Sequence, residues 1–207
     1  MLLDRDDSQL LLVDYQTRLM PAIHEASSVL ANAQRLVRLA GLFQVPLWVT
    51  EENPAGLGGT VEELQTLVQQ AGGKTFAKMS FSAVAAGLLQ VLSPPAPAPK
   101  GNARSLPKHL QKPPKAQPQR HTIVMAGCEA HVCLLQTALD LLEQDFDVWV
   151  VTDASSSRSE RNRDAAFDRL AAAGAELVTT EMVAFEWLRT ADDPAFAQVL
   201  EWVKSAN

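Results

Sequence analysis

Short apolar runs that alternate with amphipathic stretches limit the fold of this chain more than any other feature. The runs occupy residues 10–13, 45–50, 75–77, 121–127, 147–154 and 175–180. They are too short for typical helices and suit strands that are buried on both faces. Strands separated by helices predict a parallel sheet, because each right-handed crossover returns the chain over the sheet. We therefore expect an α/β fold: a three-layer α/β/α sandwich with a six-stranded parallel sheet, Rossmann-like in its arrangement.

The helices between these strands are predicted from apolar spacing and from end signals. Residues 29–43 have helical spacing, and Ser27 or Ser28 is available as an N-cap. The sequence TVEE at residues 60–63 has the form of a capping box and predicts the start of the next helix. A further helical stretch is expected over residues 83–92.

Length and composition suit one globular domain over residues 1–207. Single cores stay efficient up to roughly 250 residues, so the chain is long enough to bury a sizeable core. Apolar residues make up 47% of the sequence and charged residues 20%, which excludes wholesale disorder. Two cysteines cannot form a disulfide framework, and we find neither a leader sequence nor an apolar run of about 18 residues. We therefore expect a cytoplasmic protein with no membrane contact.

Residues 93–120 interrupt the alternation of strands and helices. The segment holds eight prolines and six Lys or Arg residues without one acid, and we interpret it as a proline-rich basic insertion. It is expected to be an extended, solvated loop; the alternative is an arm for an acidic partner or a neighbouring subunit. The rest of the chain has 12 basic against 24 acidic residues, so the insertion interrupts a strongly acidic body.

Three reactive side chains follow the predicted strands. Asp14 closes the first strand, Lys78 closes the third, and Cys133 lies just after the fourth, near the start of a helix. In parallel α/β sheets, ligands bind beyond the carboxyl ends of the strands, at the point where the strand order reverses. These three residues are therefore candidates for one site.

A helix start and a nearby cation both favour the ionised form of a thiol. We therefore expect Cys133 to be partly thiolate at neutral pH, with Lys78 as the cation and Asp14 as the group that moves protons. Each residue also has a plainer interpretation: a buried small hydrophobe for Cys133, a solvated charge for Lys78 and a turn residue for Asp14. Cys128, at the end of an apolar strand, is expected in the core.

Four motifs, in order along the chain, resemble those of the isochorismatase-like cysteine hydrolases. This family includes nicotinamidases and several amidohydrolases. The motifs are LLVDYQ around Asp14, FAKMSFSA around Lys78, GCEAHVCLLQTALDLLEQ around Cys133 and VVTDASSSR at residues 150–158. The resemblance extends over most of the chain, with the insertion as its one interruption.

The resemblance implies a fold, a set of catalytic residues and an activity. Asp14, Lys78 and Cys133 match the catalytic triad of the family. The peptide bond between Cys128 and Glu129 matches a cis bond, and the backbone N–H groups of Glu129 and Cys133 would then point at a developing oxyanion. By similarity, the fold is the α/β sandwich expected from the strand pattern.

The chain departs from the nicotinamidases after its second predicted strand. Those enzymes look similar but carry an Asp and histidines there that hold a metal ion, whereas this sequence reads VTEENPAGLGGT. None of the four histidines follows that strand, so we expect neither a metal site nor a cofactor. The segment resembles a subgroup of isochorismatase domain-containing proteins, most of which have Gln where Glu52 stands. The candidates for lining a substrate pocket are Tyr15, Glu52, Asn53, Phe81 and His131, with a structural or rim role favoured for the last.

Together these observations predict a metal-independent cysteine hydrolase. It would act on a small-molecule substrate with an amide or related C–N bond, through a Cys–Asp–Lys triad and a thioester intermediate. One alternative is a binding or scaffold protein that keeps the fold without turnover. Another is a nucleic-acid-associated protein that uses the basic insertion, although that segment has no Phe, Tyr or Trp for stacking bases. The apolar stretch at residues 185–203 suggests a homo-oligomer, unless it caps the sheet of the monomer.

Overall fold

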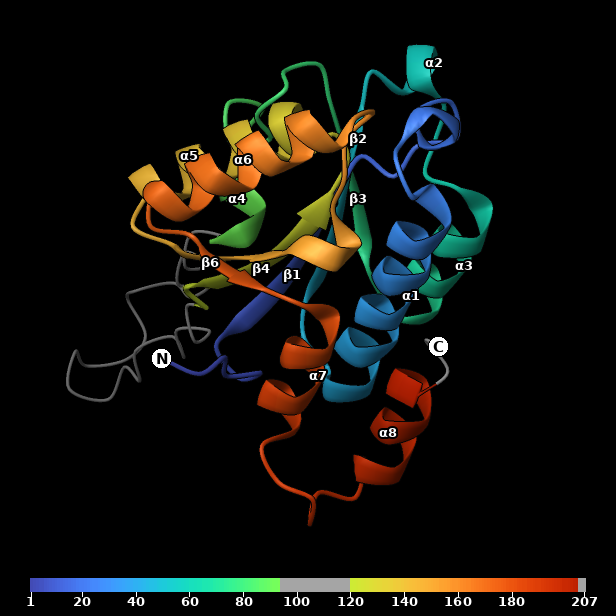
Figure 1. Ribbon diagram of the computed structural model, residues 1–207, viewed down its shortest axis with the longest axis vertical. Coiled ribbons are helices and arrows are strands. Elements are labelled where there is room, and N and C mark those ends of the chain that lie inside the picture. The colour runs from blue at the N-terminus through green and yellow to red at the C-terminus, as the bar shows by residue number, and fades with distance from the viewer. Residues whose placement is uncertain (94–119, 205–207) are drawn as a thin grey trace, which may run out of the picture.

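One parallel sheet lies at the centre of the computed structural model, which describes residues 1–93 and 120–204. Within those residues the sheet has six strands, in the order β3-β2-β1-β4-β5-β6 (Figure 1). The strands are β1 (Ser8–Val13), β2 (Leu47–Glu52), β3 (Lys74–Lys78), β4 (Thr122–Gly127), β5 (Asp147–Val151) and β6 (Glu176–Val178). Every neighbouring pair is parallel, so the predicted α/β class and the six-stranded parallel sheet are confirmed.

Helices cover both faces of the sheet and give the predicted three layers (Figure 1). One face carries α1 (Ala26–Phe43), α3 (Glu62–Gln70), α7 (Thr180–Leu188) and α8 (Phe196–Lys204). The other carries α4 (Leu89–Leu92), α5 (Leu135–Glu143) and α6 (Glu160–Ala172). Shorter elements are η1 (Met20–Ala22), α2 (Pro54–Leu57), the π-helical η3 (Ala130–Leu134) and η4 (Thr152–Ala154). None of the described helices is long and apolar enough to cross a membrane.

The central strand β1 shows why the apolar runs are continuous. Leu10 and Leu12 pack into the core beneath α1 and α7, whereas Leu11 and Val13 pack into the core on the α5 side. Successive side chains on a strand point to opposite faces, so a strand covered on both faces is apolar at every position. At Gly127, which ends β4, a Cβ atom would lie 2.4 Å from the Val13 carbonyl oxygen. Only glycine therefore lets β4 approach β1 so closely at the edge where both strands end.

The start of α1 differs from the prediction. The helix begins at Ala26, and its N-cap residue is Glu25, whose backbone lies in the left-handed region at φ 55°. The N-cap makes no side-chain hydrogen bond to the helix, so neither Ser27 nor Ser28 acts as the cap. The helix starts before Ser27, so both serines lie in its first turn. Apolar spacing does not reveal this turn, because the serines are polar.

Two further helical predictions need correction. The first turn of α3 has no side-chain cap, because the Thr60 hydroxyl donates a hydrogen bond to Glu51 Oε1 at 2.8 Å instead. Within the stretch predicted at residues 83–92, only the four residues of α4 are α-helical. Gly87 precedes them with φ 99°, a left-handed conformation that ends any continuous helix.

The apolar carboxyl-terminal stretch caps the sheet of the monomer. Trp187 of α7 and Val199 of α8 have no exposed surface, and Trp187 Nε1 donates a hydrogen bond to Ser8 Oγ at 3.1 Å. Phe185, by contrast, keeps 37% of its surface exposed. This stretch therefore contributes mainly to the core of one chain, which removes it as the reason to expect an oligomer.

The two ends of the proline-rich insertion meet at one side chain. Gln9 Nε2 donates hydrogen bonds to the carbonyl oxygens of Leu92 and Arg120, each at 3.1 Å. These two oxygens therefore cannot lie farther apart than twice that distance. Residues 94–119 lie outside the described residues, so the loop and arm interpretations of the insertion stay predictions.

The anchor of the insertion lies far from the candidate site. The Arg120 guanidinium donates hydrogen bonds to the carbonyl oxygens of Arg5 and Ser8, at 2.6 and 2.8 Å. Ser8 is the first residue of β1, whereas Asp14 follows its last residue. The insertion is thus attached at the amino edge of the sheet, opposite the edge where the candidate catalytic residues gather.

We expect the domain to keep its fold when residues 94–119 are replaced by a short Gly-Ser linker, because the two ends already meet at Gln9. Each halving of a flexible loop changes its closure free energy by only about 0.6 kcal/mol. The melting temperature, followed by circular dichroism, should therefore shift by no more than about 5 °C. Gln9→Ala in the full-length chain is the control, and it should lower the melting temperature by removing the anchor. Loss of cooperative unfolding in the linker variant would show that the segment is part of the core.

Candidate active site

The strand order identifies one edge of the sheet as the place for a site. The order reverses between β1 and β4, and ligands in such folds bind beyond the carboxyl ends of the strands at this point. Asp14 follows β1, Glu52 ends β2, Lys78 ends β3, and Cys133 lies in η3 beyond β4. The topology therefore brings all four side chains to the same edge, including the three that the sequence predicted.

Asp14 is held by side chains from the two strands beyond its own. Its backbone is left-handed, with φ 57°, and its side chain has no exposed surface. Oδ1 accepts a hydrogen bond from the Thr50 hydroxyl at 2.6 Å, and Oδ2 accepts one from Lys78 Nζ at 2.8 Å. Both carboxylate oxygens are therefore fixed. The contact with Thr50, which lies on β2, was not predicted from the sequence.

Lys78 bridges two carboxylates. Its ammonium lies 2.8 Å from Asp14 Oδ2 and 2.9 Å from Glu52 Oε2. β2 lies between β1 and β3, and Lys78 is in register with Glu52 at the end of β2. Burial by itself lowers the pKa of Lys78, but the charge of Asp14 and the hydrogen bonds to both carboxylates outweigh burial and raise that pKa above its ordinary value.

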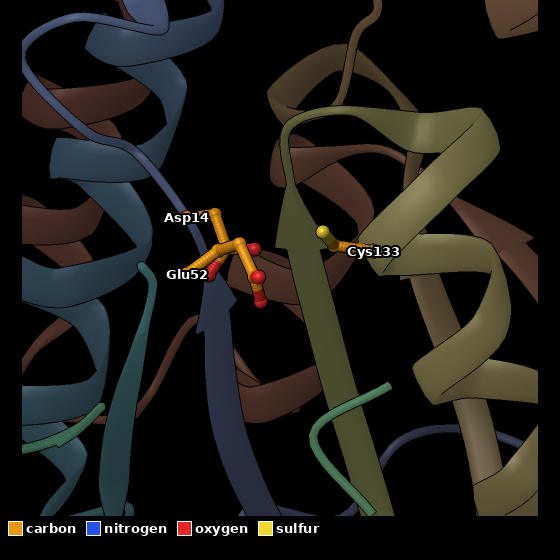
Figure 2. Close-up of side chains that lie close together, drawn as sticks. All are labelled: Asp14, Glu52 and Cys133. Atoms are coloured by element: carbon orange, nitrogen blue, oxygen red, sulfur yellow. The ribbon is translucent and has the colours of Figure 1, made fainter. Parts of the chain in front are cut away.

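Cys133 faces the two carboxylates from the far side of the site. Figure 2 shows its sulfur turned toward Asp14 and Glu52, and Sγ and one oxygen of each carboxylate lie within 4.8 Å of one another. The residue is 6% exposed. It lies near the start of a helix, as predicted; this first turn, η3, is π-helical and leads into α5.

The surroundings of Cys133 raise the pKa of its thiol, which argues against the expected partial thiolate. Burial is the largest cause that raises its pKa, and the charge of Asp14 and a hydrogen bond to Asp14 raise it further. Lys78 lowers the pKa, but Glu52 adds a second negative charge that opposes Lys78. The prediction rested on one carboxylate, Asp14, for one cation, whereas the folded site has two carboxylates.

Cys128 lies in the core, as expected. It has no exposed surface, its N–H donates a hydrogen bond to the Val13 carbonyl at 2.9 Å, and burial raises the pKa of its thiol to about 12. The peptide bond that joins Cys128 to Glu129 is cis. Glu129 Oε2 in turn accepts a hydrogen bond from Arg158 Nε at 2.8 Å.

Two of the candidate pocket residues make structural contacts. Tyr15 has no exposed surface, and its hydroxyl donates a hydrogen bond to the Ala154 carbonyl at 2.5 Å, so it belongs to the core. Asn53 is the N-cap of α2, and its side chain accepts a hydrogen bond from the Gly56 N–H at 3.2 Å. Position next to a strand end does not determine which way a side chain points, and this is why the sequence misplaced Tyr15.

The other candidate pocket residues reach the surface or the site. Phe81 is 53% exposed. His131 is partly buried, and its Nδ1 lies 2.9 Å from Ser157 Oγ. Glu52 is part of the charged cluster itself. Roles in substrate binding for Phe81 and His131 stay predictions.

Among the described residues, one group of metal-ligating side chains lies close together: Asp14, Glu52 and Cys133. The Lys78 ammonium already contacts both carboxylates, so a divalent cation would have to displace it. The metal would also have to deprotonate a thiol whose pKa is raised. The cluster therefore suits an ammonium better than a metal ion, and a metal-independent site stays our prediction.

Comparison with known proteins identifies the family. The Isochorismatase domain model matches residues 102–182. Isochorismatase domain-containing protein 2A of Mus musculus is 33% identical over 199 residues, which cover 96% of this chain and 84% of that protein. The chain belongs to the isochorismatase family. The resemblance drawn from the four motifs is thus confirmed, and family membership suggests a hydrolase.

Solved structures of isochorismatase-like proteins share the whole fold. The MAR1 ribonuclease from Caenorhabditis elegans has a TM-score of 0.81 and 28% identity, covering 100% of this chain and 95% of its own. YcaC from Escherichia coli, an octameric hydrolase of unknown specificity, has a TM-score of 0.77 and 26% identity, covering 100% of this chain and 93% of its own. One is called a ribonuclease and the other a hydrolase of unknown specificity, and the shared fold alone does not fix the reaction.

Alkylation of Cys133 by iodoacetamide should be slow at neutral pH and should rise about tenfold per pH unit up to about pH 9. Only the thiolate reacts, and the folded site raises the pKa of this thiol. Lys78→Met should slow the reaction further, since Lys78 lowers that pKa. Peptide mass spectrometry after timed quenching measures each thiol separately, and the fully buried Cys128 should be labelled last. An alkylation rate that no longer rises with pH above neutral pH would reveal a preformed thiolate.

Proposed function

We propose that this isochorismatase-family protein is a metal-independent cysteine hydrolase that cleaves a small amide or a related C–N bond. Cys133 acts as the nucleophile, Asp14 as the proton acceptor and donor, and Lys78 as the cation that holds Asp14 in place. The observation that carries the proposal is the approach of Cys133 Sγ to within 4.8 Å of a buried carboxylate that Thr50 and Lys78 orient. A nucleophile beside a base that further groups hold in place is the arrangement that acyl transfer requires.

The first half of the reaction forms a thioester. Asp14 takes the thiol proton as Cys133 Sγ bonds to the carbonyl carbon, and the carbonyl electron pair moves to oxygen. When this tetrahedral species collapses, the C–N bond breaks and Asp14 returns the proton to the leaving amine. Because the pKa of the Cys133 thiol is raised, the proton has to leave as the sulfur attacks, and the proposed reaction therefore depends on a base at this position.

The second half hydrolyses the thioester. A water molecule attacks the same carbon while Asp14 takes one of its protons, and the C–S bond then breaks. The departing sulfur of Cys133 receives that proton, which releases a carboxylic acid and restores the enzyme. The backbone N–H groups of Glu129 and Cys133 are the proposed donors to the oxyanion in both halves, and one such donor is worth roughly 2.7–4 kcal/mol.

The likeness to the MAR1 ribonuclease supports a second candidate function, the cleavage of RNA. Against it, Asp14 and Glu52 outnumber Lys78, and the resulting negative charge would repel a phosphodiester. A fluorogenic RNA oligonucleotide separates the two candidates. Cleavage that is absent from a Cys133→Ala preparation, combined with no reaction on amides, would favour the nuclease.

We also propose that the protein is a homo-oligomer that acts in the cytoplasm. YcaC from Escherichia coli is octameric. Met79 and Phe81 are 73% and 53% exposed in the single chain and offer apolar surface that a second copy would cover. Light scattering coupled to size-exclusion chromatography measures the mass, and a monomer at micromolar concentration would contradict the proposal. Cell fractionation tests the compartment.

Intact-protein mass spectrometry after incubation with a panel of small amides tests the proposed reaction. The wild-type protein should carry a transient acyl adduct at Cys133 and release the amine, and EDTA should change neither result. Cys133→Ala should show no adduct, whereas Cys128→Ala should keep the reaction with a lower stability. Asp14→Asn should slow adduct formation by roughly 10²–10⁴-fold, the usual contribution of a positioned base.

Two outcomes of the mass spectrometry would contradict the proposed function. One is an adduct that forms on another residue while Cys133→Ala keeps full turnover. The other is activity that disappears with EDTA and returns with zinc, since the proposed steps use only side chains of this chain. Absence of any adduct or amine release over a broad panel would favour the scaffold alternative.

A further inference from the structure

Glu52 gives the site a charge that the three proposed catalytic residues alone would not have. Lys78 and Asp14 compensate each other across 2.8 Å, and Glu52 then adds a second carboxylate 2.9 Å from the same ammonium. Two carboxylates therefore face one ammonium. With the thiol of Cys133 neutral, the cluster carries one net negative charge.

Glu52 is also the charged side chain of this cluster that solvent reaches. The side chains of Asp14 and Lys78 have no exposed surface, whereas that of Glu52 is 10% exposed. A molecule that approaches Cys133 Sγ comes close to Glu52, because the sulfur and the two carboxylates lie within 4.8 Å of one another (Figure 2). At this distance, in surroundings with little water, charge attraction or repulsion amounts to several times thermal energy.

The main chain of Glu52 is fixed by a buried amide. Gln16 has no exposed surface, and its Oε1 accepts a hydrogen bond from the Glu52 N–H at 2.9 Å. Its Nε2 donates to the Glu52 carbonyl at 2.9 Å and to the Gly58 carbonyl at 2.6 Å. Gln16 was not predicted to belong to the site. Its side chain forms two hydrogen bonds with the main chain of Glu52, as a neighbouring strand would. The second carboxylate is thus a built part of the site.

Other charges near this edge do not cancel that of Glu52. Glu129, which follows β4, pairs with Arg158 at 2.8 Å, so these two compensate each other. Arg158 itself is 62% exposed, and water screens its charge. The electrostatic character of the site is therefore set by the excess carboxylate.

We infer that Glu52 determines substrate charge: it makes the site favour amides with a cationic or N–H-rich group beside the scissile carbon and reject anionic ones. This inference rests on the proposed role of Cys133 as the nucleophile. An amine, amidinium or guanidinium group next to the reacting carbonyl would meet the exposed edge of Glu52. A carboxylate or phosphate in the same place would meet a like charge with no free cation to offset it among the described members of the cluster.

Two thiol reagents of similar size and opposite charge test this inference without a known substrate. They are the aminoethyl and sulfonatoethyl methanethiosulfonates, which transfer their charged thioalkyl group to the thiolate sulfur and release methanesulfinate. The rate constant at Cys133 for each, measured by mass spectrometry in the full-length protein, is divided by its value for glutathione. The cationic reagent should be favoured at least tenfold in the wild-type protein, and Glu52→Gln should reduce this preference about tenfold, on the order of one unit charge nearby.

Two further variants, compared with Glu52→Gln, separate an effect of charge on the preference from an effect of altered structure. Glu52→Asp keeps the charge and should keep most of the preference. Glu143→Gln is the matched control: it removes one negative charge from the exposed end of α5 and should leave the charge preference unchanged. Because the measurement is a ratio, a general change in the reactivity of Cys133 in Glu52→Gln cancels out.

The outcomes also separate the inference from the proposed function. Equal charge preference in wild type and Glu52→Gln, with Cys133 labelled in both, would overturn the inference and leave the nucleophile intact. No labelling of Cys133 in the folded wild-type protein by either reagent would overturn the nucleophile, and the inference with it.

Discussion

The buried ammonium of Lys78 is the interaction on which the arrangement of this site depends. Parallel strands bring their carboxyl ends to one edge, and β1 and β2 both end there with an acid. Burying two carboxylates side by side is costly unless a cation lies between them, since each loses the solvation of water. Lys78 supplies that cation from β3, at 2.8 Å from Asp14 and 2.9 Å from Glu52. Without it, the edge of the sheet could not hold both acids.

The same charge balance bears on the proposed role of Cys133 as the nucleophile. Burial is the largest cause that raises the pKa of Cys133, and the charges of Asp14 and Glu52 raise it further against the opposing charge of Lys78. The site is therefore suited to a neutral thiol that passes its proton to Asp14 during attack, in the manner of a serine hydrolase, and less suited to a stable ion pair. Glu52, which adds to the rise of that pKa, is also the acid that an incoming substrate would meet. One residue thus links the protonation of the nucleophile to the charge of the molecules that the site would accept.

Much of this arrangement could be predicted from the sequence, and the rest could not for physical reasons. The alternation of apolar runs and helical stretches predicted the six-stranded parallel sheet, and strand ends predicted where Asp14, Lys78 and Cys133 would gather. The bridge from Lys78 to Glu52 depends on the order and register of β2 and β3, which local periodicity does not contain. The start of α3 was misplaced because the Thr60 hydroxyl donates to Glu51, and that of α1 because the left-handed backbone of Glu25 leaves no signal in apolar spacing. Apolar periodicity shows which faces of an element are buried. The charge balance of the site can be predicted only when the neighbours of each strand are known.

A double-mutant cycle on Lys78 and Glu52 tests the central claim most directly. Urea unfolding at neutral pH is the right condition: the pKa of Lys78 is raised, so its ion pairs contribute fully below the ordinary lysine pKa and are lost only as pH rises through the folded-state value. Lys78→Met should lower the free energy of unfolding by roughly 3–5 kcal/mol, because two buried carboxylates are left facing each other. Adding Glu52→Gln to that variant should recover at least about 1 kcal/mol, a coupling typical of residues in contact. Losses that simply add, with no recovery in the double variant, would contradict the claim that one buried ammonium holds both acids in this site.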